Sequence, residues 1–118
     1  MEAFRIKNGI SATRYLGSNG TVTTGSGTAS LDLSTGTTFS FTPSGSTTVT
    51  FTNPPATGIA IGFSVEIVGD ASAITWPSSI KWHLATAPTA TATKELYTFV
   101  TTDGGTTYYG KKAAEGIA

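Results

Sequence analysis

The sequence predicts an all-β fold: a single β-sandwich or jelly-roll-like domain preceded by an extended N-terminal arm. Threonine makes up about a fifth of the 118 residues, and its β-branched side chain suits the solvent face of a strand and disfavours a helix. Large apolar residues alternate with small or polar ones in short runs, and proline- or glycine-rich turn signals separate these runs. Helical spacing of apolar residues is absent over any stretch of about 11 residues.

Residues 1–26 are expected to form the extended arm, with a possible short strand in it, outside the core. The arm mixes apolar and basic side chains and ends in a polar passage rich in glycine and serine. Apolar residues on such an arm are explained most simply by docking on a neighbouring chain. The alternative is that the arm folds back on its own domain as an edge strand. The expected docking residues are Phe4, Arg5, Ile6, Lys7, Ile10 and Arg14.

Residues 27–112 are expected to form the β-sandwich. Its first strands are predicted where apolar residues alternate, at 31–33, 39–41 and 49–51. The clearest strand is 59–67, because its odd positions are uniformly large and apolar while its even ones are small or polar. One face of this strand is therefore expected in the core.

The second half of the domain is expected to contain shorter extended pieces and a hairpin. Apolar residues at 74–76 and 80–84 lie on either side of Pro77. The runs 94–102 and 106–110 flank Asp103-Gly104-Gly105, which is a hairpin signal. Residues 113–118 are expected to be a C-terminal tail, since the helix-favouring stretch 111–115 stops at Gly116 after about one turn.

Charge and cysteine content exclude some partners. Seven basic and seven acidic side chains give a formal net charge of zero, so no bulk field attracts nucleic acid or an anionic membrane. No apolar run approaches the ~20 residues that cross a bilayer, and the start of the chain lacks the apolar region of a signal peptide. There are no cysteines, which excludes disulfides and thiolate metal sites. We expect neither a nucleic-acid nor a membrane partner.

The sequence contains no recognisable catalytic, cofactor or metal-binding motif. His83 is the single histidine, the carboxylates are scattered, and no Gly-x-Ser-x-Gly elbow frames a nucleophile. A glycoside hydrolase needs a pair of facing carboxylates, which the spacing does not predict. Four aromatic residues are possible glycan contacts, with packing in the core or between subunits as the default: Trp76, Trp82, Tyr108 and Tyr109.

Low charge also favours association. Charged residues are 12% of the chain, about half the usual share. A small all-β domain has open strand edges that must be covered, charged or paired. Because few charged side chains are available to prevent these edges from pairing with another strand, we expect the domain to associate with other chains.

Segments from most of the chain resemble a small β module found in virion proteins of tailed bacteriophages, especially those of marine and cyanobacterial hosts. These segments are 31–36, 51–56, Ile74-Thr75-Trp76-Pro77-Ser78-Ser79-Ile80-Lys81-Trp82, and 99–110. The arm segment 4–10 also resembles the start of some phage structural proteins.

The resemblance implies a non-enzymatic virion component. The module occurs in tail fibres and in capsid-surface proteins, and a fibre is usually a long chain in which the module is only the end. The main expectation is therefore a capsid decoration (cement) protein on the outer surface of the head, bound to the major capsid protein and to copies of itself, for example as a trimer. The alternative is a tail-fibre or receptor-binding module that recognises a host glycan. A small polysaccharide-degrading enzyme is the third possibility.

Overall fold

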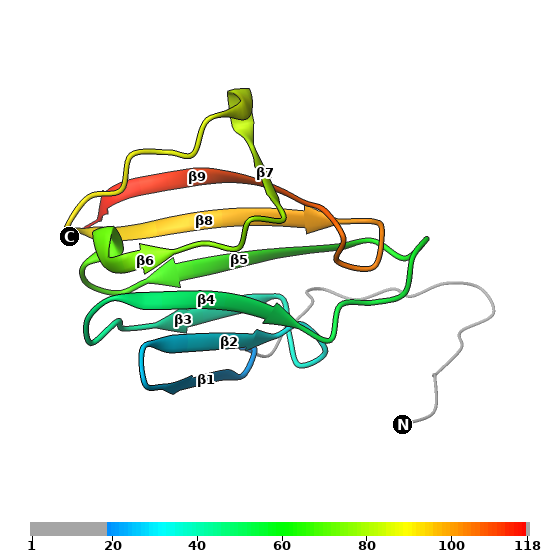
Figure 1. Cartoon of the computed structure of the whole chain (residues 1–118), viewed down its shortest axis with the longest axis horizontal. Coiled ribbons are helices and arrows are strands. Elements are labelled where there is room, and N and C mark those ends of the chain that lie inside the picture. Colours follow the sequence, from blue (N-terminus) through cyan, green and yellow to red (C-terminus); the bar gives the residue numbers. More distant parts are fainter. Residues whose placement is uncertain (1–18, 118) are drawn as a thin grey trace, which may run out of the picture.

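The computed structural model describes residues 19–117 and confirms the all-β sandwich (Figure 1). The first sheet has four strands in the order β1 (Val22–Gly25), β2 (Thr28–Asp32), β4 (Thr47–Thr52) and β6 (Ile74–Thr75). The second has five, in the order β3 (Thr38–Phe41), β5 (Ile61–Ile67), β8 (Lys94–Thr101), β9 (Tyr108–Ile117) and β7 (Ile80–Trp82). Two short 3₁₀ turns are η1 (Ala71–Ala73) and η2 (His83–Ala85). No helix in the described range is long and apolar enough to cross a membrane.

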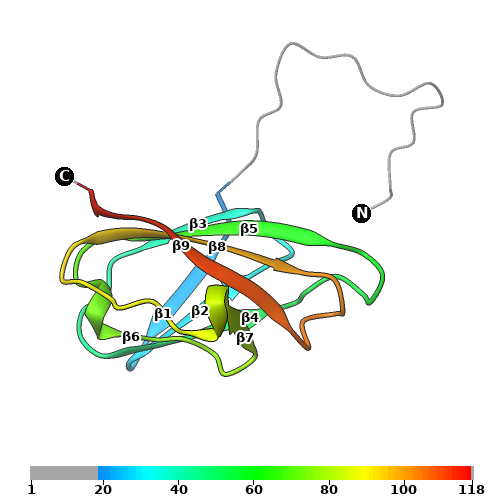
Figure 2. The same cartoon turned by 90° about the horizontal axis from the view of Figure 1, so that it is seen from above.

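The chain passes from one sheet to the other after each strand from β2 to β6. Strands two apart in sequence therefore lie side by side and run parallel, as β2 does with β4, β3 with β5, and β4 with β6. The last three strands stay in one sheet, where β8 pairs antiparallel with both β5 and β9. Figure 2 shows the two layers edge-on, with β9 descending toward β7.

The core lies between the inner faces of the two sheets. Three odd positions of β5 are buried as expected, with Phe63, Val65 and Ile67 at most 3% exposed, while Ile61 at the start of the strand is half-buried. Ile59 lies before the strand and is 58% exposed, because the chain turns at Gly58, whose φ is +93°. The other fully buried apolar side chains come from β2, β3, β4 and β8 and include Leu31, Phe39, Val49, Tyr97 and Phe99.

Aromatic rings join the two sheets. Phe51 extends from β4 and packs against rings of the opposite sheet, with centroid distances of 4.7 Å to Tyr108, 5.0 Å to Phe63 and 5.3 Å to Phe99. Aromatic pairs at such distances add about 0.5–1.5 kcal/mol each beyond the area they bury. This cluster therefore supplies much of the contact that holds the sheets together.

The sheets extend further at both ends than the expected domain limits of 27–112. β1 lies within the segment expected to be the arm, because a turn at Ser26 and Gly27, with φ of 28° and 79°, folds it back onto β2. β9 continues to Ile117, where a tail was expected, because its second half pairs with the start of β8. Backbone pairing thus overrides the helix-favouring composition there. The hairpin expected at 103–105 is present between β8 and β9.

Candidate binding surface on the five-stranded sheet

The outer face of the five-stranded sheet carries an exposed aromatic residue at the centre of a row. Tyr109 on β9 lies opposite Val100 on β8 and opposite Lys81 on β7. Successive side chains alternate between the faces of a strand, so these three point outward while their neighbours pack inward. Tyr109 is 59% exposed and Val100 is 42% exposed. An exposed aromatic and an exposed aliphatic side chain thus lie side by side on this face.

This row borders a groove of about 370 Å³, here called the Tyr109 groove. Most of its exposed lining is apolar. Its lining residues are Lys81, Trp82, His83, Thr98, Phe99, Val100, Tyr109, Gly110 and Lys111. A second hollow of about 680 Å³ shares Trp82, His83 and Lys111 with it and continues along the segment 84–89. The two hollows are therefore adjacent.

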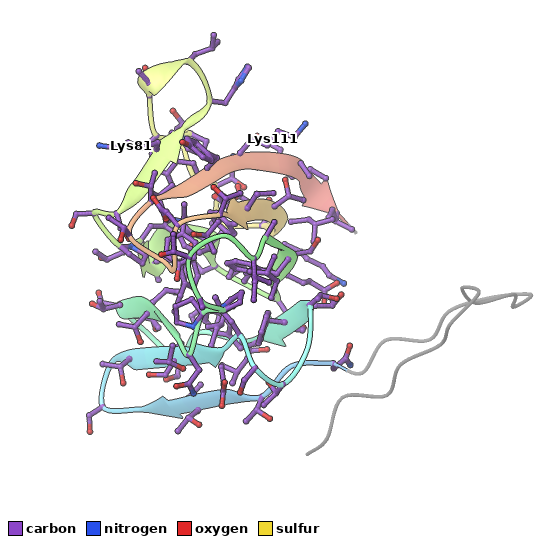
Figure 3. The ribbon with its side chains drawn as sticks, turned by 90° about the vertical axis from the view of Figure 1, so that its right-hand side faces the viewer. Lys81 and Lys111 are labelled. Carbon is purple, nitrogen blue, oxygen red and sulfur yellow. The ribbon has the colours of Figure 1, made fainter. Side chains whose placement is uncertain are left out.

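Two cations beside the Tyr109 groove lack acidic partners. Lys94 pairs with Glu66 at 3.2 Å, and Lys112 pairs with Glu95 at 3.1 Å. By contrast, no carboxylate of residues 19–117 lies within 4.0 Å of the amine of Lys81 or Lys111. Figure 3 shows Lys81 on β7 and Lys111 on β9, both directed away from the body of the domain, with their amines pointing to opposite sides of the view. The groove is therefore bordered by two positive charges that no carboxylate of residues 19–117 neutralises by a close contact.

A projecting turn stands at one end of the groove. β7 leads directly into η2, which stands clear of both sheets in Figure 1. Leu84, in the middle of η2, is 81% exposed and has a φ of 58°, and Ala85 has a φ of 57°. Non-glycine residues in this region cost about 1 kcal/mol or more each, and such strain is concentrated at functional sites.

A buried polar network fixes the wall of the second hollow. The Glu95 side chain is fully buried and accepts hydrogen bonds from the Thr91 amide at 2.8 Å and hydroxyl at 2.6 Å, and from the Tyr97 hydroxyl. The Lys112 amine donates to Glu95 and, at 2.6 Å, to the carbonyl oxygen of Thr89. The loop before β8 is thereby tied to β9.

The pKa values of this network reflect burial and hydrogen bonding. Burial opposes ionisation of Glu95, but the hydrogen bonds from Thr91, Tyr97 and Lys112 outweigh it and hold the pKa of Glu95 below its ordinary value. Burial, reinforced by the neighbouring carboxylate of Glu95, raises the pKa of Tyr97. Burial of Lys112 disfavours its charge, but Glu115 and Glu95 raise the pKa of its amine. The network therefore holds an ionised carboxylate beside a charged amine.

The four aromatic residues proposed to contact a glycan lie in two different environments. The half-buried rings of Trp76 and Trp82 meet edge to face at 6.0 Å and pack against Tyr97. Tyr108 is 3% exposed because it points into the core, whereas its neighbour Tyr109 points outward. The four rings do not form one platform, and Tyr109 presents most of its ring to solvent.

The remaining predicted site residues lie in the arm. Phe4, Arg5, Ile6, Lys7, Ile10 and Arg14 all fall outside the described range, so their docking role stays a prediction. Within residues 19–117, no group of three or more acidic or histidine side chains is arranged to hold a metal ion.

Sequence reasoning did not identify Lys81, Val100 and Lys111 as surface residues of interest. The alternation of β8 and β9 places Val100 and Lys111 on an outer face, and only the pairing of β8 and β7 with β9 brings Val100 and Lys81 beside Tyr109.

Comparison of the chain with models of known protein families, with curated proteins and with solved structures gives no significant match.

Proposed function

We propose that this chain is a non-enzymatic structural protein of a bacteriophage virion, a decoration protein that binds the major capsid protein on the outer surface of the head. The observation that carries the proposal is the division of charge along the chain. Residues 1–18 have three basic side chains and one acidic one, while residues 19–117 have four basic and six acidic ones. The arm is therefore a cationic, partly apolar segment attached to a β-sandwich with a net charge of −2.

Such a division suits a protein that attaches by its arm. The apolar side chains Phe4, Ile6 and Ile10 supply contact area on the capsid. The basic side chains Arg5, Lys7 and Arg14 pair with acidic groups there and set orientation and register more than affinity. The sandwich then stands outward as a compact unit.

Open strand edges at one side of the sandwich support contacts with neighbouring copies. β1 and β3 are edge strands of their sheets and lie near each other (Figure 1). Beyond a bridge between Asn19 and Thr38, no described strand pairs with the outer side of β3. Such edges carry backbone groups that pair with a strand of another chain. The sandwich edge next to the arm is thus suited to association on a lattice.

Stabilisation of the head follows from mass action. A protein that binds the assembled lattice and not the separated subunits stabilises the lattice by RT ln(1 + [L]/Kd), which is about 2.7 kcal/mol per site at a free concentration of 100 Kd. No reaction is needed. Many weak contacts repeated over the lattice are sufficient.

The arm's role is tested by binding to expanded capsids that lack this protein. We expect the intact chain to cosediment with the capsids and a variant lacking residues 2–14 to lose binding. A full-length variant with Arg5, Lys7 and Arg14 replaced by glutamine should bind at least tenfold more weakly. Lys94→Gln, which removes a cation from the sandwich, serves as the matched control. Undiminished capsid binding by the deletion variant would overturn the arm's role.

A second candidate function is recognition of a host glycan by a tail-fibre or receptor-binding module. The exposed ring of Tyr109 beside a groove favours it. The two functions differ in where the chain lies in the virion, so localisation by electron microscopy separates them.

A further inference from the structure

We propose that the Tyr109 groove binds an acidic polysaccharide, one whose sugar units carry carboxylate groups. This inference deepens the second candidate function, because it names the ligand class. It does not depend on the capsid proposal, since a decoration protein and a fibre module expose such a groove equally well.

The shape of the site suits a chain of sugars. The Tyr109 groove of about 370 Å³ lies next to the hollow of about 680 Å³, and the two share Trp82, His83 and Lys111. Small-molecule sites typically enclose about 300–1,000 Å³, so each hollow is large enough for one or more sugar units. The projecting turn at Leu84 borders the second hollow.

The exposed aromatic ring supplies the apolar contact. Tyr109 is 59% exposed on a strand that is paired on both sides, so the backbone fixes its position. A ring held in this way offers a large rigid surface with a polar hydroxyl at its tip. The C–H face of a sugar packs on such a ring, while its hydroxyls remain in water. The neighbouring side chains Val100 and Thr98 extend this surface.

The free lysines select a negatively charged ligand. Lys81 and Lys111 border the groove without a carboxylate of residues 19–117 within 4.0 Å, whereas Lys94 and Lys112 are both paired. A ligand carboxylate beside either amine gains Coulomb energy, and because both lysines are exposed, dissolved salt screens that gain. His83, shared by both hollows, adds an imidazole that exchanges hydrogen bonds with sugar hydroxyls.

Charge spacing favours an acidic polysaccharide over a nucleic acid. Duplex DNA carries a charge about every 1.7 Å and requires several cations in a row. This groove offers two separated cations on a sandwich whose formal net charge is −2. A polyuronate carries one carboxylate per sugar, so its charges are spaced widely enough to match two separated amines. Its lower charge density also means less repulsion from the acidic residues of the sandwich.

The test is titration of the full chain with oligosaccharides of four to six uronic acid units, observed by NMR. The panel comprises galacturonate, glucuronate and mixed guluronate–mannuronate oligomers. The methyl ester of the galacturonate oligomer is the neutral control, because it keeps the sugar and removes the charge. We expect binding of at least one free acid, with shifts concentrated at Tyr109, Thr98 and His83. For the galacturonate oligomer, esterification should weaken binding at least tenfold; for any oligomer that binds, affinity should fall as salt rises.

Variants locate the site. Tyr109→Ala should weaken binding at least tenfold, and Lys81→Met and Lys111→Met should each weaken it about fivefold. Lys94→Met, on the same face but paired with Glu66, is the matched control and should leave binding unchanged. The proposal is overturned if no acidic oligomer binds, if the ester binds as well as the acid, if Tyr109→Ala binds normally, or if single-stranded DNA binds more tightly. None of these results bears on attachment to the capsid, which depends on the arm.

Discussion

Replacing Lys112 with methionine should destabilise the protein far more than the same change at its neighbour Lys111. The side chain of Lys112 is 9% exposed and lies 3.1 Å from the carboxylate of Glu95, which is fully buried. Methionine keeps the aliphatic stem and removes the amine. The buried carboxylate then loses its counter-charge, and the carbonyl oxygen of Thr89 loses a donor. The substitution therefore tests the contribution of the amine, while the packing of the side-chain stem is kept.

The size of the effect follows from what remains around the carboxylate. Breaking a buried ion pair by removing one partner typically costs about 3–5 kcal/mol. Glu95 keeps two hydrogen bonds from Thr91 and one from Tyr97, so the lower end applies. We expect a loss of about 3 kcal/mol in the free energy of unfolding. For a domain of about 100 residues this lowers Tm by about 12 °C. Lys111→Met should change the free energy by less than about 0.5 kcal/mol.

Urea denaturation and thermal unfolding of the two variants measure this difference. As the pH falls through the pKa of Glu95 in the variant, the gap in stability between Lys112→Met and the unaltered protein should narrow, since protonation of Glu95 removes the unpaired charge. The double variant Glu95→Gln, Lys112→Met should be more stable than Lys112→Met alone. Equal stability of the Lys111 and Lys112 variants would refute the reasoning, because the network would then contribute no charge-dependent stability.

Three further predictions concern acid sensitivity and packing. The pKa of Glu95 lies below its ordinary value of 4.5 in the folded protein, so the stability it contributes is present above that pH and is lost as pH falls through the folded pKa; Glu95→Gln should remove part of the acid dependence of Tm. Gly110→Ala should lower the free energy of unfolding by about 1–3 kcal/mol, because the added Cβ would lie 2.6 Å from the buried ring of Phe99. In the control Gly25→Ala the added Cβ meets no atom within 4 Å, so the free energy of unfolding measured in urea should change by less than about 0.5 kcal/mol. Phe63→Ala should cost about 3–5 kcal/mol in the same assay, while Tyr109→Ala should cost less than about 1 kcal/mol; similar losses for these two would contradict the assignment of inner and outer faces.

Alternation along the chain predicted the strands well because burial on one face imposes a period of two. The run 59–67 illustrates this, since Phe63, Val65 and Ile67 are all in the core. The hairpin at 103–105 was also predictable. Glycines at 104 and 105 supply the positive φ values, and Asp103 accepts hydrogen bonds from the Thr107 amide and the Thr101 hydroxyl.

The pairing of strands was not predictable, because it depends on long-range contacts. Composition indicates a helix-favouring tail at 111–115, yet this segment extends β9 against β8. The turn at Ser26 and Gly27 has the composition of a flexible linker, but it closes a hairpin whose strand β1 adds to the first sheet. In both places pairing with the adjacent strand of the same hairpin outweighs the preference suggested by composition.

The candidate site was predictable only in part for the same reason. Tyr109 is evident as an aromatic residue near a turn, but its surroundings come from three strands. Lys81 lies 28 positions earlier in the chain and meets Tyr109 only because β7 pairs with β9. The fold also determines which carboxylates each lysine meets. The sequence therefore does not reveal that Lys112 is paired with Glu95 while Lys111 has no carboxylate of residues 19–117 within 4.0 Å.

The most direct test of the proposed function is immunogold electron microscopy of intact virions with an antibody raised against this chain. The decoration proposal predicts label spread evenly over the head, in many copies per particle. Label confined to the tail or its fibres, or particles without label, would contradict it.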